Sequence, residues 1–589
     1  MKKLFPVSHK IAGLFLLLLP LLAGCFSLPD TFPPEDAYVS GIPSPTPSFE
    51  EFTEELFCSE VSLDSLSLHY LLAEPDNYGI TDRTVTLGSV QTAVSPSESA
   101  DNLYATLITY NPETLSFEEQ LTYRTLMRHL NLLMRDTSSP YLCELLGPVT
   151  GFQAQLPILL AEYRMENEQD VEQYLALFPA VYDYFSEIAE FEKEKSRNGF
   201  FMDDTTAKEI IRQCEDFCKN PDTHFLISTF EERLSALHLP LSQKTEYIMQ
   251  HQSALYTYLF PAYELLIDTL TECLGTGENP YGLCYYDGGK DFYSLLIQKT
   301  TGSDKSPEDL KKCLMNAVDS ACLTMATALK SDSSIYTTAL HPAFPETGPE
   351  EIIQYIVLQS EEDFPLIDCG NYEFKYVPAS LQEHISPAMY LTPPIDRYEP
   401  NVIYINPNPV YDPDTLFPTI VHEGYPGHLY QTVSALSGEI NPLRYLLTPG
   451  GYAEGWATYV EHYCYKYAGL SSPLTSFLQA DEVGTLCLYA LCDLCIHYEG
   501  YTPDRLGTLL AAYGYPRETS DTVYQTLLSE PGTYLPYAVG LLEFLELKET
   551  AKTLWEEDYS DYRFHSFLVR TGPLPFSVLN EVLTDNESF

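Results

Sequence analysis

The chain has 589 residues, and its 84 Asp and Glu residues outnumber 32 Lys and Arg residues, which gives a formal net charge of −52 at pH 7. A protein this acidic repels phosphate backbones, because binding to nucleic acid depends on Lys and Arg side chains that displace condensed counterions. Nucleic-acid binding is therefore excluded as a function class. Apolar residues make up 45% of the sequence, which excludes an intrinsically disordered chain and suffices for a large core.

The N-terminus has the pattern of an export signal. Three lysines flank or precede an apolar run over residues 11–22 that is too short to span a bilayer comfortably. The run ends in Leu-Ala-Gly-Cys at residues 22–25, which resembles a bacterial lipobox; an ordinary signal peptide with a chance cysteine is the alternative. We therefore expect residues 1–24 to be removed and a lipid on Cys25 to hold the protein at the extracytoplasmic face of the cell membrane.

Proline-rich stretches divide the rest of the chain. Six prolines interrupt residues 25–50, which predicts a semi-extended tether. Further proline-rich stretches near residues 341–349 and 393–413 favour a seam between two lobes. The expected division is an N-terminal helical lobe, residues 51–345, and a C-terminal lobe, residues 346–589, that carries the metal site.

The dominant hydrophobic period is helical, with apolar residues three and four positions apart. This period predicts helices over residues 116–133, 171–193, 205–218 and 244–274. Short strands are expected over residues 372–377 and 401–405, which are β-branched or aromatic and bounded by Pro or Asn. The sequence therefore predicts a mainly α fold with a few short strands.

The cysteines do not form a disulfide scaffold. Of 14 cysteines, 13 follow Cys25, and an odd number cannot pair completely within one chain. Cys492 and Cys495 form a CxxC, which is also typical of redox or zinc sites. The pair lies in an apolar helical run, however, which favours packing as small hydrophobic residues. We expect the cysteines to be mainly free.

Residues 421–428, Val-His-Glu-Gly-Tyr-Pro-Gly-His, contain the first candidate metal ligands. In the zinc motif HExxH, two histidines four residues apart share one helix face and the Glu polarises the water. Here His428 follows His422 by six residues, which on a regular helix rotates it by about 240° and raises it by about 9 Å. Pro426 and Gly427 are expected to break the helix, and a local bulge there would absorb two residues and return His428 to the same ion. Alone, the segment is equally typical of a helix that ends in a His-Glu pair and a Pro-Gly stop.

Glu454 supplies a third candidate ligand, 26 residues after His428. At about 100° per residue, Glu454 and Glu461 share one face of a helix, and Trp456 lies on the opposite face. Carboxylates that simply face solvent are the alternative. Together with the His-Glu-His segment, however, Glu454 completes the His, His, Glu set of helical zinc peptidases. We therefore predict that His422, His428 and Glu454 bind Zn²⁺.

The residue types around these ligands suggest a mechanism. Zinc at this site keeps one position for water and lowers the pKa of that water toward about 7. Glu423 then takes the proton and passes it to the leaving amine. Tyr537 is the first candidate donor to the oxyanion and His497 the second, with Asp493 fixing the tautomer of His497; a core Tyr and a structural His are the alternatives. Glu461 is expected to support a ligand histidine rather than bind the metal.

Three segments together resemble a known family. They read His-Glu-x-x-Pro-Gly-His at 422–428, Glu-Gly-Trp-Ala-x-Tyr-x-Glu at 454–461, and Pro-Gly followed by Tyr and Gly over 531–540. They look like the bacterial family of domain of unknown function 885 (DUF885), which is similar in outline to the helical zincins of the thimet-oligopeptidase and carboxypeptidase Taq kind. Over residues 50–585, the resemblance implies a large two-lobed helical, zincin-like (gluzincin) fold with a deep cleft.

The chain also departs from the family pattern. Leu429 follows His428 where the family commonly has a second His, Glu399 replaces an Arg, Cys495 a Gly, and Thr533 a Gln. The preferred function is a membrane-tethered zinc metallopeptidase that hydrolyses short extracellular peptides. The departures favour a second hypothesis, a non-catalytic lipoprotein that binds peptides or another solute in the same cleft. A zinc hydrolase acting on another amide or an ester is the third.

Overall fold

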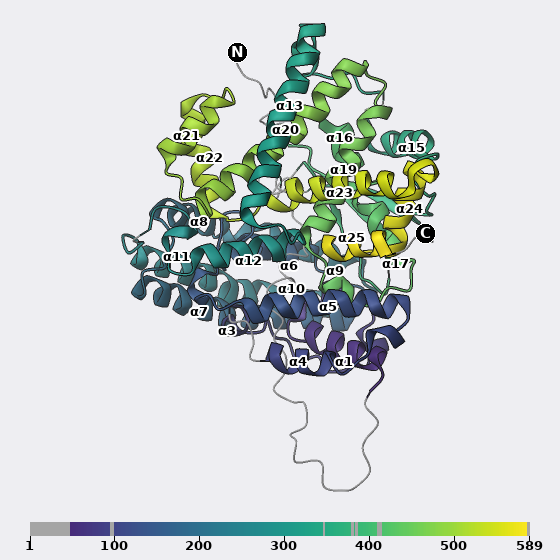
Figure 1. Ribbon diagram of the computed structural model, residues 1–589. Coiled ribbons are helices and arrows are strands. Elements are labelled where there is room, and N and C mark those ends of the chain that lie inside the picture. Colours follow the sequence, from purple (N-terminus) through teal and green to yellow (C-terminus); the bar gives the residue numbers. More distant parts are fainter. Residues whose placement is uncertain are drawn as a thin grey trace.

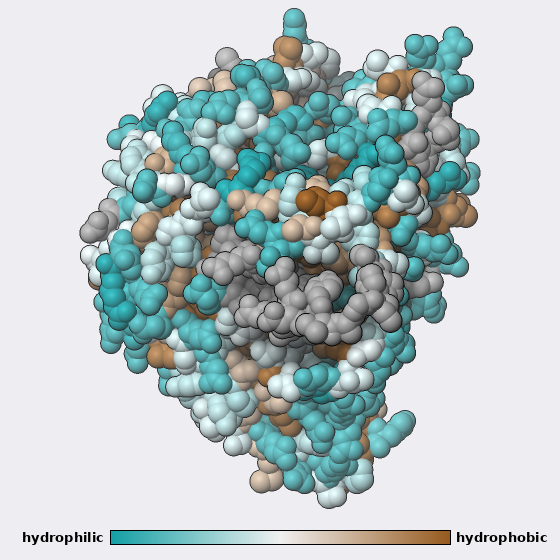
Figure 2. Space-filling view, turned by 60° about the horizontal axis from the view of Figure 1, so that its bottom comes forward, coloured by the Kyte–Doolittle hydropathy of each residue, from teal (hydrophilic) through white to brown (hydrophobic). Residues whose placement is uncertain are grey.

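The computed structural model describes residues 47–94, 99–277, 279–345, 348–377, 382, 387–397, 399–408 and 415–585. The expected signal peptide, Cys25 and nearly all of the expected tether lie outside these residues. Within the described ranges, no helix combines the length and the apolar character needed to cross a membrane. On the face shown in Figure 2, the described residues are mostly hydrophilic and the hydrophobic ones are scattered.

The described residues fold into helices and one small sheet (Figure 1). Helices before the sheet are α1 (Phe49–Val61), α2 (Ser65–Leu71), α3 (Val90–Val94), α4 (Ser99–Leu107), α5 (Phe117–Arg135), α6 (Phe152–Glu162), α7 (Glu168–Arg197), α8 (Asp204–Phe217), α9 (Phe225–Ala236), α10 (Leu241–Ala254), α11 (Phe260–Cys273), α12 (Gly289–Thr301), α13 (Pro307–Ser331), α14 (Ile335–Thr338) and α15 (Pro349–Ser360). The strands are β1 (Tyr372–Tyr376), β2 (Ala388–Leu391) and β3 (Asn401–Ile405). Helices after the sheet are α16 (Leu416–Glu423), α17 (His428–Leu436), α18 (Leu443–Leu446), α19 (Gly450–Cys464), α20 (Ser472–His497), α21 (Pro503–Ala512), α22 (Arg517–Ser529), α23 (Leu535–Trp555), α24 (Asp561–Thr571) and α25 (Phe576–Asp585).

The four predicted helices are confirmed as α5, α7, α8, and α10 with α11, and a capping box marks the start of α5. Ser116 precedes α5 and accepts the N–H of Glu119, whose carboxylate accepts the N–H of Ser116 in return. A capping box of the same kind at Ser48 and Glu51 starts α1 at Phe49, so helix begins inside the segment 25–50 that was expected to be tether. Between α10 and α11 the chain stays helical through a π-helical turn.

The predicted strands at 372–377 and 401–405 are confirmed as β1 and β3, but the sheet has a third strand that the sequence did not reveal. The strand order is β1-β3-β2, with β1 parallel and β2 antiparallel to β3. Tyr390 of β2 lies opposite Ile403 of β3. Because β2 is a four-residue run that is buried on both faces, it has no alternation by which a strand is told from a helix.

The core of the C-terminal half includes helices from earlier in the chain. Helix α13 packs lengthwise beside α20 (Figure 1), and Leu314 and Val318 of α13 share one buried cluster with Leu488 and Leu491 of α20. The cysteines of the CxxC, Cys492 and Cys495, also lie buried in this cluster. Thirteen cysteines fall in the described ranges, and none of them forms a disulfide there. The lobe boundary near residue 345 stays a prediction.

Helices α19 and α23 approach each other more closely than side chains would allow. A Cβ atom on Gly455 would lie 2.4 Å from the Cα of Gly540, and one on Gly540 would lie 2.2 Å from the carbonyl oxygen of Gly451. Such distances are below any van der Waals contact, so the two backbones touch through glycines. This contact places the first turns of α23 against the helix that contains Glu454.

Replacement of Gly540 by alanine is expected to lower the free energy of unfolding by about 1 to 3 kcal/mol, because the added methyl group has to push two backbones apart. Denaturant unfolding followed by circular dichroism measures this loss. Gly450→Ala is the matched control in the same helix pair, because its Cβ would meet nothing closer than 3.4 Å. Equal stability of the two variants would contradict the close contact.

Candidate metal centre

The chain leaves helical geometry for four residues between the two candidate histidines. Helix α16 ends at Glu423, and α17 begins at His428. Gly427 makes this possible, because a Cβ there would lie 1.8 Å from the carbonyl oxygen of His422. The break predicted at Pro-Gly is therefore present, but it separates two helices instead of forming a bulge inside one. His428 consequently starts a new helix, so the offset of a continuous helix does not apply.

Three buried side chains converge at this break. The Nε2 atoms of His422 and His428 lie 3.5 Å and 3.6 Å from Glu454 Oε2. The donor atoms of the three residues all lie within 4.8 Å of one another, and the residues are 1%, 5% and 3% exposed. Helix α19 presents Glu454 to the histidines, and its Trp456 packs into the core on the other side. The structure thus brings together the three residues predicted as ligands.

The geometry fits a tetrahedral zinc ion. Protein ligands lie about 2.0 to 2.2 Å from zinc, so two tetrahedral donors are separated by roughly 3.4 Å, close to the distances above. Among the described residues, His428 Nε2 and Glu423 Oε1 are buried and have no hydrogen-bond partner. Such atoms are costly in a folded protein unless something binds them. An ion coordinated by His422, His428 and Glu454 would give His428 Nε2 the partner that it lacks.

The remaining atoms of the site are held by neighbours. Nδ1 of His422 lies 3.3 Å from Glu461 Oε2, so Glu461 occupies one ring nitrogen and leaves Nε2 for a metal. Glu461 thus contacts a candidate ligand histidine, as the sequence predicted. The backbone N–H of Tyr390 in β2 donates to Glu423 Oε2 at 2.8 Å. Sequence reasoning missed Tyr390, since its contact is made by the backbone of the strand that was not predicted.

The buried charges compensate one another in the absence of a metal. Burial alone lowers the pKa of His422, but hydrogen bonds to Glu454 and Glu461 raise it to about 10. Burial alone raises the pKa of Glu454, and its contacts with His422 and His428 lower it to about 2. The histidine and the carboxylate thus each stabilise the charged form of the other. Burial raises the pKa of Glu423, and raised pKa values are common among carboxyl groups in active sites.

Tyr537 reaches the site from α23. Its side chain is 8% exposed, and burial together with Glu454 and Glu423 raises the pKa of its hydroxyl well above the usual value. The hydroxyl therefore keeps its proton and acts as a donor. Tyr537 lies near Glu454 because glycines bring the backbones of α19 and α23 together. The spacing of residues along either helix does not predict this contact.

The structure does not bring His497 to these residues, and the role predicted for it is wrong. Its Nδ1 accepts the N–H of Leu283 at 3.3 Å, and its Nε2 lies 2.9 Å from the carbonyl oxygen of Leu527. Burial lowers the pKa of His497 to about 4, so the ring is neutral. Because both ring nitrogens are taken by backbone groups, His497 has no N–H for an oxyanion.

The role predicted for Asp493 is wrong for a related reason. Its carboxylate accepts the hydroxyl of Tyr293 and the N–H of Gly532, at 2.9 Å for the latter, and it makes no contact with a ring nitrogen of His497. A separation of four residues on α20 put the two side chains on one face, but each turns to a different neighbour. Asp493 therefore does not set a histidine tautomer.

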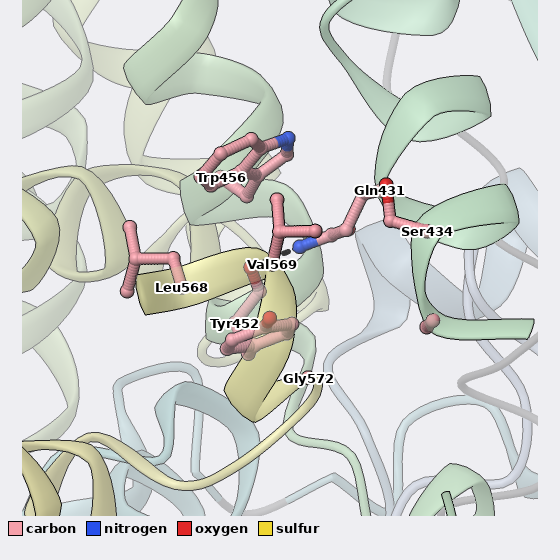
Figure 3. A pocket seen from close by; sticks show the side chains of 8 residues that line it. Gln431, Ser434, Tyr452, Trp456, Leu568, Val569 and Gly572 are labelled. Atoms are coloured by element: carbon pink, nitrogen blue, oxygen red, sulfur yellow. Dashed lines mark hydrogen bonds between the residues drawn. The ribbon is translucent and has the colours of Figure 1, made fainter. Parts of the chain in front are cut away.

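A pocket lies on the other side of the helices that supply two of the ligands (Figure 3). Its wall is formed by α17, α19 and α24, with residues Gln431, Ser434, Ala435, Tyr452, Trp456, Leu568, Val569 and Gly572. The side-chain amide of Gln431 donates to the carbonyl oxygen of Tyr452 across it at 3.4 Å. Since Tyr452 and Trp456 are each two residues from Glu454, they point away from the candidate ligands.

Two solved structures share this fold. A protein named as a lipoprotein from Colwellia psychrerythraea is 18% identical, with a TM-score of 0.77 over 91% of this chain and 99% of that chain. One from Shewanella oneidensis, named as a lipoprotein of unknown function, is 15% identical, with a TM-score of 0.64 over 91% of this chain and 100% of that chain. An oligoendopeptidase F from Bacillus anthracis aligns with a TM-score of only 0.28, at 11% identity over 83% and 95% of the two chains.

The family comparison agrees with the motifs. None of the curated proteins matches the chain. The model of a family described as bacterial protein of unknown function matches residues 78–583, a range that includes every candidate ligand and the whole sheet. The chain therefore belongs to the DUF885 family.

Proposed function

We propose that this protein is a zinc metallopeptidase, held to the membrane by a lipid on Cys25, that hydrolyses short extracellular peptides. The convergence of His422, His428 and Glu454, with the carboxylate of Glu423 buried beside them, is the observation that supports the proposal most strongly. A zincin-like fold with a cleft over the site belongs to the same proposal. The motif at residues 22–25 and the two lipoproteins of the same fold support the anchor.

Zinc bound by these ligands would polarise a water molecule and the scissile carbonyl group. The residues of the chain do the rest. Glu423, held at Oε2 by the N–H of Tyr390, keeps Oε1 to take a proton from the attacking water and to give it to the leaving amine. The hydroxyl of Tyr537 donates a hydrogen bond to the oxygen on which negative charge develops and keeps its proton. Glu461 keeps the ring of His422 in one orientation.

The proposal is tested by metal content and peptide turnover together. Purified protein is expected to contain about one zinc ion per chain, measured by inductively coupled plasma mass spectrometry, and to cleave short unstructured peptides. Removal of zinc with a chelator should stop cleavage, and added zinc should restore it. Protein that contains no zinc and binds none would contradict the proposal.

A second candidate function is a lipoprotein that binds peptides without cleaving them. It is favoured by the burial of the site, because Glu423 and Glu454 are only 2% and 3% exposed, and by Leu429 in place of the family's second histidine. Calorimetric titration with the same peptides distinguishes the two functions. Binding without products at every zinc loading would favour the second function, and steady turnover would exclude it.

Binding of zinc to the metal-free protein is expected to release about one proton near pH 7.5. His422 has its pKa raised to about 10, so its ring is protonated at that pH, whereas a metal ligand must be neutral. Zinc affinity should therefore rise about tenfold per pH unit as pH increases toward 10. Calorimetry in two buffers of different ionisation enthalpy counts the proton. Binding without proton release would show that His422 is already neutral.

Replacement of Tyr537 by phenylalanine is expected to lower kcat by about 10²- to 10³-fold and to change KM little, because the hydroxyl is used when charge develops in the transition state. Steady-state kinetics on one short peptide measures both constants. Tyr534→Phe is the matched control, since the ring of this neighbouring tyrosine packs at a tilt against Tyr489 instead. Equal kcat values for Tyr537→Phe and wild type would contradict the role.

A further inference from the structure

The turn before α23 is held by two buried carboxylates that the mechanism does not use. We propose that Asp493, acting through Gly532, is a positioning residue for Tyr537, with Glu530 holding the other side of the same turn. The proposal deepens the proposed function and rests on it only for the use of Tyr537 in turnover. It gives Asp493 a role in place of the one that the sequence suggested.

Asp493 connects three helices at this turn. It is fully buried on α20, its Oδ2 accepts the N–H of Gly532 at 2.9 Å, and its Oδ1 accepts the hydroxyl of Tyr293 from α12. Gly532 has φ +84°, a backbone conformation that other residues rarely adopt. The carboxylate thus holds the turn at Gly532 by a hydrogen bond to its backbone N–H, and the hydroxyl of Tyr293 orients the carboxylate.

Glu530 holds the turn from the N-terminal half of the chain. Its side chain is 7% exposed, and its Oε1 accepts the backbone N–H groups of Val149 and Thr150, at 2.9 Å for the latter. The loop closes tightly around it, because a Cβ on Gly147 would lie 2.7 Å from Glu530 Oε1. The segment 530–532 is therefore hydrogen-bonded at Gly532 to Asp493 of α20, which Tyr293 of α12 supports, and at Glu530 to the loop 147–151.

The turn transmits its position to Tyr537 over a short distance. The N–H of Leu535, the first residue of α23, donates to the carbonyl oxygen of Gly532 at 3.1 Å, and Tyr537 lies in the first turn of that helix. The contact between Gly455 and Gly540 limits how closely α23 approaches α19. The hydrogen bond from Leu535 to Gly532 fixes where α23 begins. A shift at Gly532 therefore moves the Tyr537 hydroxyl relative to Glu454.

Burial of the carboxyl groups of Asp493 and Glu530 costs free energy, so stability alone is a poor reason for their presence at this turn. Burial raises the pKa of Asp493 to about 7 and that of Glu530 to about 6. Well-packed apolar residues commonly stabilise a core as well as buried charged groups do. Two hydrogen-bonded carboxylates at one turn instead specify a geometry, which is what a hydrogen-bond donor in an active site requires.

The kinetic test compares Asp493→Asn with Glu530→Gln in the zinc-loaded protein. Tyr293 and Gly532 donate to different oxygens of Asp493, and asparagine replaces one of these oxygens by an NH₂ group, so it cannot accept at both positions. Glutamine at 530 keeps one oxygen, which is enough to accept both N–H groups of the loop. Asp493→Asn is expected to lower kcat by about 10- to 100-fold with KM and zinc content unchanged. Glu530→Gln should stay within about twofold of wild type, and Glu530→Ala should lower kcat.

Combination with Tyr537→Phe separates positioning from general structural damage. If Asp493 acts through the tyrosine, Asp493→Asn should lower kcat in the wild-type background and have almost no further effect in the Tyr537→Phe background. The same fold-loss in both backgrounds would overturn the proposal. If Asp493→Asn does not fold, Tyr293→Phe serves in its place, because it removes only the hydroxyl that orients the carboxylate.

A spectroscopic test does not depend on turnover. 3-Fluorotyrosine incorporated at position 537 reports its surroundings by ¹⁹F NMR, and its resonance is expected to move in Asp493→Asn and Tyr293→Phe but not in Glu530→Gln. An unmoved resonance in the two variants would overturn the positioning role. A moved resonance in a protein that cleaves no peptide would leave the positioning role intact and would refute the proposed peptidase function instead.

Discussion

Glu423→Gln is expected to lower kcat for peptide hydrolysis by about 10²- to 10⁴-fold while zinc stays bound. Glutamine has the size of glutamate and can still accept the N–H of Tyr390, but its amide cannot take up a proton. None of the three candidate ligands is altered, so the zinc content should equal that of the wild type. Stopped assays with one short peptide at saturating concentration measure kcat.

The control for this variant is Glu439→Gln, which removes the same charge from an exposed position and should leave kcat unchanged. The control matters because the chain is so acidic that any single charge change could alter attraction of substrate. Turnover by Glu423→Gln close to that of the control would show that another group accepts the proton. The peptidase mechanism proposed above would then be wrong.

His428→Ala is expected to weaken zinc binding by more than about 100-fold. Loss of a residue that only hydrogen-bonds to a metal ligand costs about 10- to 100-fold in affinity, and loss of the ligand itself should cost more. The substitution also leaves a cavity between α16 and α17, next to His422 and Glu454. Competition with a fluorescent chelator measures the affinity. Thermal unfolding gives a second measurement, because a bound metal raises Tm by mass action. Addition of zinc should therefore raise the Tm of the wild type but no longer that of His428→Ala.

The matched control is His238→Ala, which removes an exposed histidine. It should bind zinc as the wild type does and should show the same rise in Tm on addition of zinc. If His428→Ala also kept the wild-type affinity, the ion would have to be held by a different set of residues. The close approach of His428 to Glu454 would then be an ordinary buried ion pair.

The three candidate ligands could be picked out from the sequence because each signal was local. His422 and Glu423 form a His-Glu pair, Pro426 and Gly427 stop a helix, and the helical period of α19 separates Glu454 from its apolar face. The break itself had to be inferred, and its form was different, since it ends one helix and starts another. Chemistry and periodicity were sufficient here because they concern neighbours along the chain.

The parts that escaped prediction depend on contacts between segments far apart in the sequence. Tyr390 supports Glu423 by its backbone N–H, and no side-chain pattern reports a backbone contact. The pairing of Gly455 with Gly540 is set by the packing of two helices. For His497, helical spacing gave the correct helix face but not the partner, because the ring turns to the backbone of Leu283 and Leu527.

Mass spectrometry of a synthetic peptide library incubated with the purified protein decides whether this protein is a zinc-dependent peptidase. We expect defined cleavage products from the zinc-loaded protein, their disappearance after removal of the metal by a chelator, and their return with about one equivalent of zinc per chain. A library that stays intact with the zinc-loaded protein, or is cleaved equally well after removal of the metal, would contradict a zinc-dependent peptidase.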